Sequence, residues 1–96
     1  IVPGYLVKPS SGLYNTIDDP TVLKIGSFRF FFYSGDFQEP PHIHVERDQC
    51  TAKIWLHPVR LDHNRGFRAH EIREILRLVE THQEQFLEAW NDYFSD

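Results

Sequence analysis

The sequence has little of what builds disulfide-linked or membrane-spanning proteins. One of its 96 residues is cysteine, Cys50, and none is methionine, so an internal disulfide is excluded. No stretch approaches the ~18 consecutive apolar residues that a membrane-spanning helix needs. The first residues also lack the basic and apolar segments of a secretory signal. We therefore expect a soluble, intracellular protein of a reducing compartment, with no contact with a membrane.

The chain is long enough for one domain and too short for two. Its first nineteen residues hold many helix and strand breakers, among them Pro3, Gly4, Pro9 and Gly12. We predict a loosely ordered arm over residues 1–19 and a single domain over residues 20–96. Aromatic residues make up 15% of the chain, which lets a small domain build a core from few side chains.

The hydrophobic pattern predicts an α+β fold. Short β-branched or alternating segments, typical of strands, cover residues 21–25, 28–33, 42–46 and 52–57. Residues 59–67 contain Asn64-Arg65-Gly66 and are predicted to form a loop. From Ala69 to Phe94 there is no proline or glycine, and apolar residues recur at helical spacing except at Gln83. We expect a small antiparallel sheet of about four strands, packed on one long C-terminal amphipathic helix with a bend near residues 81–83.

The expected helix would be roughly 39 Å long. That length exceeds what a small sheet covers, so the helix end could project and pair with a second copy of the chain. A homodimer through this helix is therefore one expected assembly.

Alternation along the strands divides the side chains between two faces of the sheet. One face is apolar and is predicted to lie under the helix; it carries Phe28, Phe30, Phe32, Ile43, Val45, Ala52, Ile54 and Leu56. The other face is mixed and carries Arg29, Phe31, Tyr33, His42, His44, Glu46, Lys53, Trp55 and His57. We expect an exposed aromatic patch of Phe31, Tyr33 and Trp55, which would mark a partner surface unless the N-terminal arm covers it.

Three polar residues of the mixed face alternate along one strand. His42, His44 and Glu46 would point the same way, and two imidazoles with a carboxylate can bind a divalent transition metal, with His57 as a fourth ligand. Structural or partner contacts are the alternative, and so is acid–base catalysis by His42, His44 or His57. No cofactor is required by the sequence.

A basic segment precedes the helix. Arg60, His63, Arg65 and Arg68 could contact phosphate or an acidic partner, or could remain solvated. The net charge of −4 does not favour nucleic acid as the main partner. The chain also has no Gly-rich phosphate loop and no recognisable nucleophile motif.

Several segments together resemble a small bacterial family of unknown function, numbered 4160 among such domains. They are residues 20–26, 30–34, 39–46 (Glu-Pro-Pro-His-Ile-His-Val-Glu), 52–56, 64–67 and 88–94. The resemblance implies a cytoplasmic prokaryotic protein, often encoded beside a second small protein in an arrangement like a toxin–antitoxin pair. It supplies no catalytic residues. Where the family often has a serine to cap the helix, this chain has Arg68, so Glu71 alone remains of the capping box.

These observations lead to one main functional hypothesis and two alternatives. The main hypothesis is a binding component of a two-protein, toxin–antitoxin-like system. Its partner is a small protein encoded nearby, contacted by Phe31, Tyr33, Trp55, Arg60, Arg65 and Arg68. The first alternative is a toxin-type enzyme that acts on RNA through the histidines and arginines. The second is a metal-binding domain centred on His42, His44 and Glu46.

Overall fold

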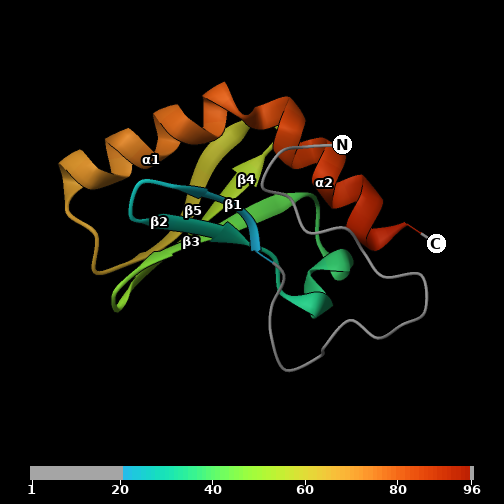
Figure 1. Cartoon of the computed structure of the whole chain (residues 1–96), viewed down its shortest axis with the longest axis horizontal. Coiled ribbons are helices and arrows are strands. Elements are labelled where there is room, and N and C mark those ends of the chain that lie inside the picture. Colours follow the sequence, from blue (N-terminus) through green and yellow to red (C-terminus); the bar gives the residue numbers. More distant parts are fainter. Residues whose placement is uncertain (1–20, 96) are drawn as a thin grey trace.

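A computed structural model describes residues 21–95 of the chain. In that range a sheet forms one layer, and two helices cover one of its faces as a second layer (Figure 1). The elements are β1 Thr21–Ile25, β2 Phe28–Phe31, the 3-10 helix η1 Ser34–Gln38, β3 His42–Arg47, β4 Cys50–Leu56, β5 Val59–Arg65, α1 Ala69–Thr81 and α2 Gln83–Phe94. The predicted arm over residues 1–19 lies outside the described part of the chain.

The sheet is an antiparallel meander in which each strand pairs with the next along the chain. This confirms the α+β class, with five strands where about four were predicted. The predicted loop over residues 59–67 is wrong, because Val59–Arg65 pairs with β4 as an edge strand. No side chain of β5 is fully buried, and only Val59 and Leu61 are apolar, so the alternation is too short to mark a strand in the sequence. Backbone hydrogen bonds to β4 contribute more than burial to holding this strand in place.

The apolar face of the sheet is the covered one, as predicted. All eight residues predicted to lie there are buried. The helices contribute the facing side chains, and the rings of Phe30 in β2 and Phe86 in α2 are 5.2 Å apart. The buried residues of the two helices are Ile72, Ile75, Val79, Phe86, Ala89 and Trp90. Burial of these apolar surfaces is the main source of stability in a domain of this size.

The expected single helix is two helices that meet at His82, within the range where a bend was expected. The Gln83 amide Nε2 donates a hydrogen bond of 2.6 Å to the carbonyl of Leu56 at the end of β4. This contact explains the polar residue in the apolar stripe, because an apolar side chain would give that carbonyl no donor. The helices among the described residues are too short or too polar to span a membrane.

The predicted projection of the helix end is wrong. Trp90 is buried, and the ring of Phe94 lies 5.6 Å from that of Phe32. The break at His82 thus keeps α2 against the sheet. A homodimer stays a prediction, without a projecting helix to support it.

Glu71 links the start of α1 to the sheet. Its Oε1 accepts a hydrogen bond of 2.8 Å from the backbone N–H of Arg68, and its Oε2 forms an ion pair with the guanidinium of Arg47 in β3. The first contact is the half of the capping box that remains without a serine cap. The Arg68 amide and, second, Arg47 lower the pKa of Glu71 below its ordinary value of 4.5.

This lowered pKa gives a testable pH dependence. Above pH 4.5 the carboxylate is charged in the folded and unfolded chains, and its contacts stabilise the fold. As the pH falls below 4.5 the unfolded chain binds the proton first, so this contribution is lost. We expect Glu71→Gln to lower the melting temperature by a few degrees at pH 7, and the difference from wild type to shrink below about pH 4.5 in melting curves followed by circular dichroism.

Glu74→Gln is the matched control, because Glu74 is exposed on the same helix. It should change the melting temperature little at any pH. A wild-type advantage over Glu71→Gln that stays constant down to pH 3 would contradict the assigned role of the charge.

Candidate functional site

The face of the sheet turned away from the helices is called here the outer face. Residues opposite one another on antiparallel strands share a face, and the register defines three rows across it. The rows are Arg29–Glu46–Thr51–Arg65, Phe31–His44–Lys53–His63 and His42–Trp55–Arg60. The register thus confirms the mixed face predicted from β2, β3 and β4, while Tyr33 and His57 lie just beyond the strand ends.

The expected exposed aromatic patch is only partly present. Phe31 is 1% exposed, so its prediction as an exposed contact residue is wrong. The guanidinium of Arg29 lies 4.3 Å from the centre of its ring, and the imidazole of His44 stacks on it at 5.5 Å. Tyr33 is 43% exposed and Trp55 is half-buried. Long polar side chains on the same face therefore cover an aromatic ring that alternation alone leaves open.

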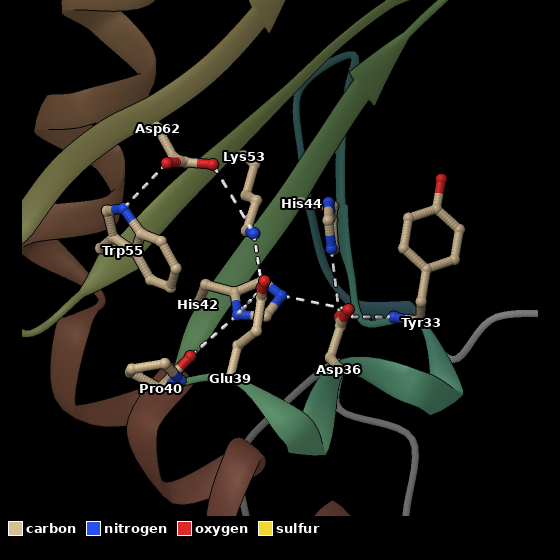
Figure 2. A network of polar contacts seen from close by, with 9 residues as sticks. All are labelled: Tyr33, Asp36, Glu39, Pro40, His42, His44, Lys53, Trp55 and Asp62. Carbon is tan, nitrogen blue, oxygen red and sulfur yellow. Dashed lines mark hydrogen bonds and ion pairs between the residues drawn. The ribbon is translucent and has the colours of Figure 1, made fainter.

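The carboxylate of Asp36 joins η1 to two histidines of β3 (Figure 2). Its Oδ2 accepts a hydrogen bond of 2.8 Å from the N–H of Tyr33 and lies 3.1 Å from Nε2 of His44. Its Oδ1 lies 3.1 Å from Nε2 of His42. We call these residues the Asp36–His42–His44 triad. They are the only group in the described part of the chain whose donor atoms could together hold a metal ion.

His42 is the buried member of the triad. Its side chain is fully buried, with the ring of Trp90 at 5.1 Å and that of Trp55 at 5.5 Å. Its Nδ1 lies 2.9 Å from the carbonyl oxygen of Pro40. A carbonyl only accepts, so Nδ1 carries the proton. Nε2 faces Asp36 but lacks the alignment of a hydrogen bond, and it is buried without any other partner.

The histidines lower the pKa of Asp36. Burial of the carboxyl raises its pKa, but close contact with His42, and hydrogen bonds from His44 and the Tyr33 amide, outweigh that effect. The pKa of Asp36 is therefore held well below its usual range, and the group is a carboxylate at neutral pH.

A second polar network lies beside the triad. The Lys53 ammonium contacts Glu39 Oε1 at 2.5 Å and Asp62 Oδ2 at 3.6 Å, and Asp62 Oδ1 accepts a hydrogen bond of 3.2 Å from Trp55 Nε1. Figure 2 shows these contacts, which run from Glu39, just after η1, through Lys53 in β4 to Asp62 in β5. Burial opposes the charge of Lys53, yet the two carboxylates outweigh it and raise the pKa of Lys53. The lysine therefore stays positively charged at neutral pH.

A pocket of about 430 Å³ opens on the outer face between β2 and β5. Its polar lining is Tyr33, His44, Thr51, Lys53, Asp62, His63 and Arg65. It thus brings two histidines, a lysine and an arginine together, a combination that suits an anionic ligand. Only His44 belongs to both the triad and the pocket.

The remaining predicted site residues lie apart from the triad. Glu46 pairs with Arg29 at 2.8 Å, and Asp36 takes the place in the metal-capable group that was predicted for Glu46. His57 is in the turn after β4 and lines a second pocket together with Pro40, Pro41, Trp55 and Arg60. Arg60 and Arg65 lie on β5 rather than in a loop, and Arg68 precedes α1.

Asp36, Glu39 and Asp62 were not predicted as site residues from the sequence, and Lys53 was predicted only as a member of the mixed face. Asp36 follows a strand in a Ser-Gly-Asp segment that reads only as a turn. One local signal could have identified it, since an acidic residue three positions after Tyr33 can accept the Tyr33 amide proton, as at a helix start. Its contact with His42 and His44 depends on the fold of the connection between β2 and β3.

Comparison with known families agrees with the sequence resemblance. The family model described as Domain of unknown function (DUF4160) matches residues 27–91, and the chain belongs to this family. The match spans β2 to β5, both networks of the outer face and most of the two helices. No curated protein and no solved structure matches the chain at a significant level.

The triad can be tested by removing its charge. We expect Asp36→Asn to lower the free energy of unfolding by about 1–3 kcal/mol, because two imidazoles lose their anionic partner in a buried site. Urea unfolding in the presence of a chelator measures this change without any contribution from bound metal.

Asp48→Asn removes the same charge at an exposed turn residue with φ of 56°, a conformation that asparagine tolerates. This control should change the unfolding free energy by less than about 0.5 kcal/mol. Equal effects of the two variants would show that Asp36 matters only through the net charge of the protein.

Proposed function

We propose that this member of the family is a binding module, one component of a small cytoplasmic bacterial system of two proteins of toxin–antitoxin type. Its outer face and edge strand β5 would hold an acidic, extended segment of the partner protein. The observation that carries this proposal is the charge that the fold leaves unpaired along β5.

The carboxylates of the outer face are already engaged within the fold. Asp36 contacts two histidines, Glu39 and Asp62 contact Lys53, and Glu46 contacts Arg29. In contrast, the side chains of Arg60, Arg65 and Arg68 have no ion pair within residues 21–95. A protein of net charge −4 therefore presents a local positive stripe, and such a stripe favours an acidic partner.

The backbone of β5 supports an extended partner. β5 ends the strand order and pairs only with β4 among the described strands. An edge strand can bind a further strand through main-chain hydrogen bonds. Arg60 and Arg65 on the outer face of β5 would then contact acidic side chains of that strand, with Tyr33 at the rim of the adjacent pocket.

Charge reversal on β5 tests this surface. The double variant Arg60→Glu and Arg65→Glu should bind the small protein encoded beside this one at least about tenfold more weakly, because two attractions become repulsions. Isothermal titration with that purified protein, at about 50 mM and about 300 mM salt, measures the affinity and its screening.

The double variant Arg73→Glu and Arg77→Glu is the matched control, since both residues are exposed on α1 and the charge change is identical. It should retain wild-type affinity within about threefold. The proposal fails if the neighbouring protein does not bind wild type, or if both double variants lose affinity equally. Melting curves of all proteins verify that each variant is folded.

A second candidate function, RNA cleavage, is favoured by the pocket. His44 is oriented by Asp36, His63 lies on the same row across Lys53, and Arg65 lines the same pocket. Two imidazoles can act as base and acid, and the two cations can hold a phosphate. Of the three predicted catalytic candidates, His42 is fully buried and His57 is outside this pocket, so His44 is the one retained.

Cleavage of a fluorescent RNA oligonucleotide tests this candidate. We expect an active wild type to lose about 10²–10⁴-fold in rate in His44→Ala and in His63→Ala, and to keep its rate in His70→Ala, an exposed histidine of α1. Intact RNA after incubation with wild type from pH 5 to pH 9, with and without divalent metal, would remove this candidate and leave the binding module.

A further inference from the structure

The buried imidazole of His42 has an Nε2 atom without a hydrogen-bond partner among residues 21–95. The Pro40 carbonyl fixes the proton on Nδ1, so in the neutral ring Nε2 presents a lone pair. That lone pair faces the Oδ1 of a carboxylate at 3.1 Å. Two acceptors at this distance repel one another unless a positive species lies between them. A proton or a metal ion could be that species.

The geometry of the donors is close to that of a metal site. One atom each from Asp36, His42 and His44 can be chosen so that all lie within 4.8 Å of one another, and the two carboxylate–imidazole contacts are 3.1 Å. Ligands bound at 2.0–2.1 Å to one tetrahedral ion lie about 3.3 Å apart. The two 3.1 Å contacts use different oxygens of Asp36, and a donor pair 4.8 Å apart would have to close by about 1.5 Å to share one ion. Asp36 and His44 are both partly exposed, so their side chains have room to make this movement.

We propose that Asp36, His42 and His44 bind a divalent transition-metal ion through one carboxylate oxygen and two imidazole Nε2 atoms. The donor set of two histidines and one carboxylate is one that zinc and other first-row transition metals accept. Glu46, predicted from the sequence as the carboxylate ligand, is engaged by Arg29. The site does not depend on the partner-binding function proposed above.

Hydrogen bonds orient the side chains of the triad, as they do the ligands of known metal sites. A ligating histidine usually donates its other ring N–H to a carbonyl or carboxylate, which fixes the ring and the tautomer. His42 makes this contact with Pro40. The Tyr33 amide holds Asp36 by Oδ2, which leaves Oδ1 directed at His42. For His44 to bind through Nε2, its ring proton moves to Nδ1.

Three protein ligands leave at least one coordination position for water or another ligand. His44 also lines the pocket of about 430 Å³, so the proposed ion would lie beside that pocket. Trp90 and Trp55 close the opposite side around His42. The site is thus buried on one side and approachable on the other.

Metal titration of untagged protein, stripped with a chelator and dialysed, tests the proposal. We expect one Co²⁺ per chain, with the visible absorption of a low-coordinate cobalt site, and its displacement by Zn²⁺. Zinc should also raise the melting temperature, because the ion binds only the folded chain. Asp36→Asn and His44→Ala should each weaken binding at least about tenfold, and both variants keep the buried ring of His42.

His70→Ala is the control, because His70 is an exposed histidine of α1 outside the triad and the pocket. It should bind cobalt as wild type does. An equal loss in His70→Ala and His44→Ala would mean adventitious binding at the surface and would overturn the proposal. Failure of the wild type to take up cobalt or zinc at millimolar concentration would overturn it as well.

Nitrogen-15 spectra of the histidine rings distinguish the ion from a proton. The proposal expects that zinc displaces any proton on Nε2 of His42 and shifts the resonance of that nitrogen. A proton on Nε2 that zinc does not displace would establish a buried ion pair of His42 with Asp36, and no metal site.

Discussion

The carboxylate of Asp36 is the constraint on which the outer face of this domain depends. A carboxylate that is largely withdrawn from water is costly unless several donors or positive groups surround it. Here the Tyr33 amide, His44 and His42 surround it. Those contacts fix η1 against the start of β3, and they fix the rings of both histidines. Two adjacent elements and two imidazoles thus depend on one charged group.

The carboxylates of the outer face are paired within the fold, whereas two of its arginines are not. Each of its carboxylates contacts a positive or polar group from another strand or from η1, as in the chain from Glu39 through Lys53 to Asp62. Such pairs contribute modestly to stability where they are exposed, but they fix register and side-chain positions. Within residues 21–95, the charged side chains of this face without an ion pair are the positive ones of Arg60 and Arg65 on β5. Their charge is locally uncompensated because the fold pairs the neighbouring carboxylates.

The parts of the fold that rest on burial were predictable from sequence, and the parts that rest on polar contacts were not. Alternation from Phe28 to Leu56 identified the covered face, because burial imposes a period of two on a strand. β5 has no fully buried side chain and only two apolar residues, so it left no such pattern. Asp36 was missed because its role arises from contacts made only after the turn brings it to His42 and His44. Phe31 was assigned to the correct face, but its exposure was predicted wrongly for a related reason, since Arg29 and His44 cover its ring.

The break at His82 connects the core to the site. If α1 continued straight, its last turns would leave the sheet, and Trp90 could not reach both Phe32 in the core and His42 on the outer face, 5.4 Å and 5.1 Å from its ring. Gln83 anchors the new direction to Leu56 at the end of β4. The packing of α2 therefore keeps water from His42 and preserves the low-dielectric surroundings in which its unpartnered nitrogen faces Asp36. A change that loosens α2 would admit water to His42. Water would screen the repulsion between His42 Nε2 and the Asp36 carboxylate, so a proton or metal ion between them would stabilise the site less.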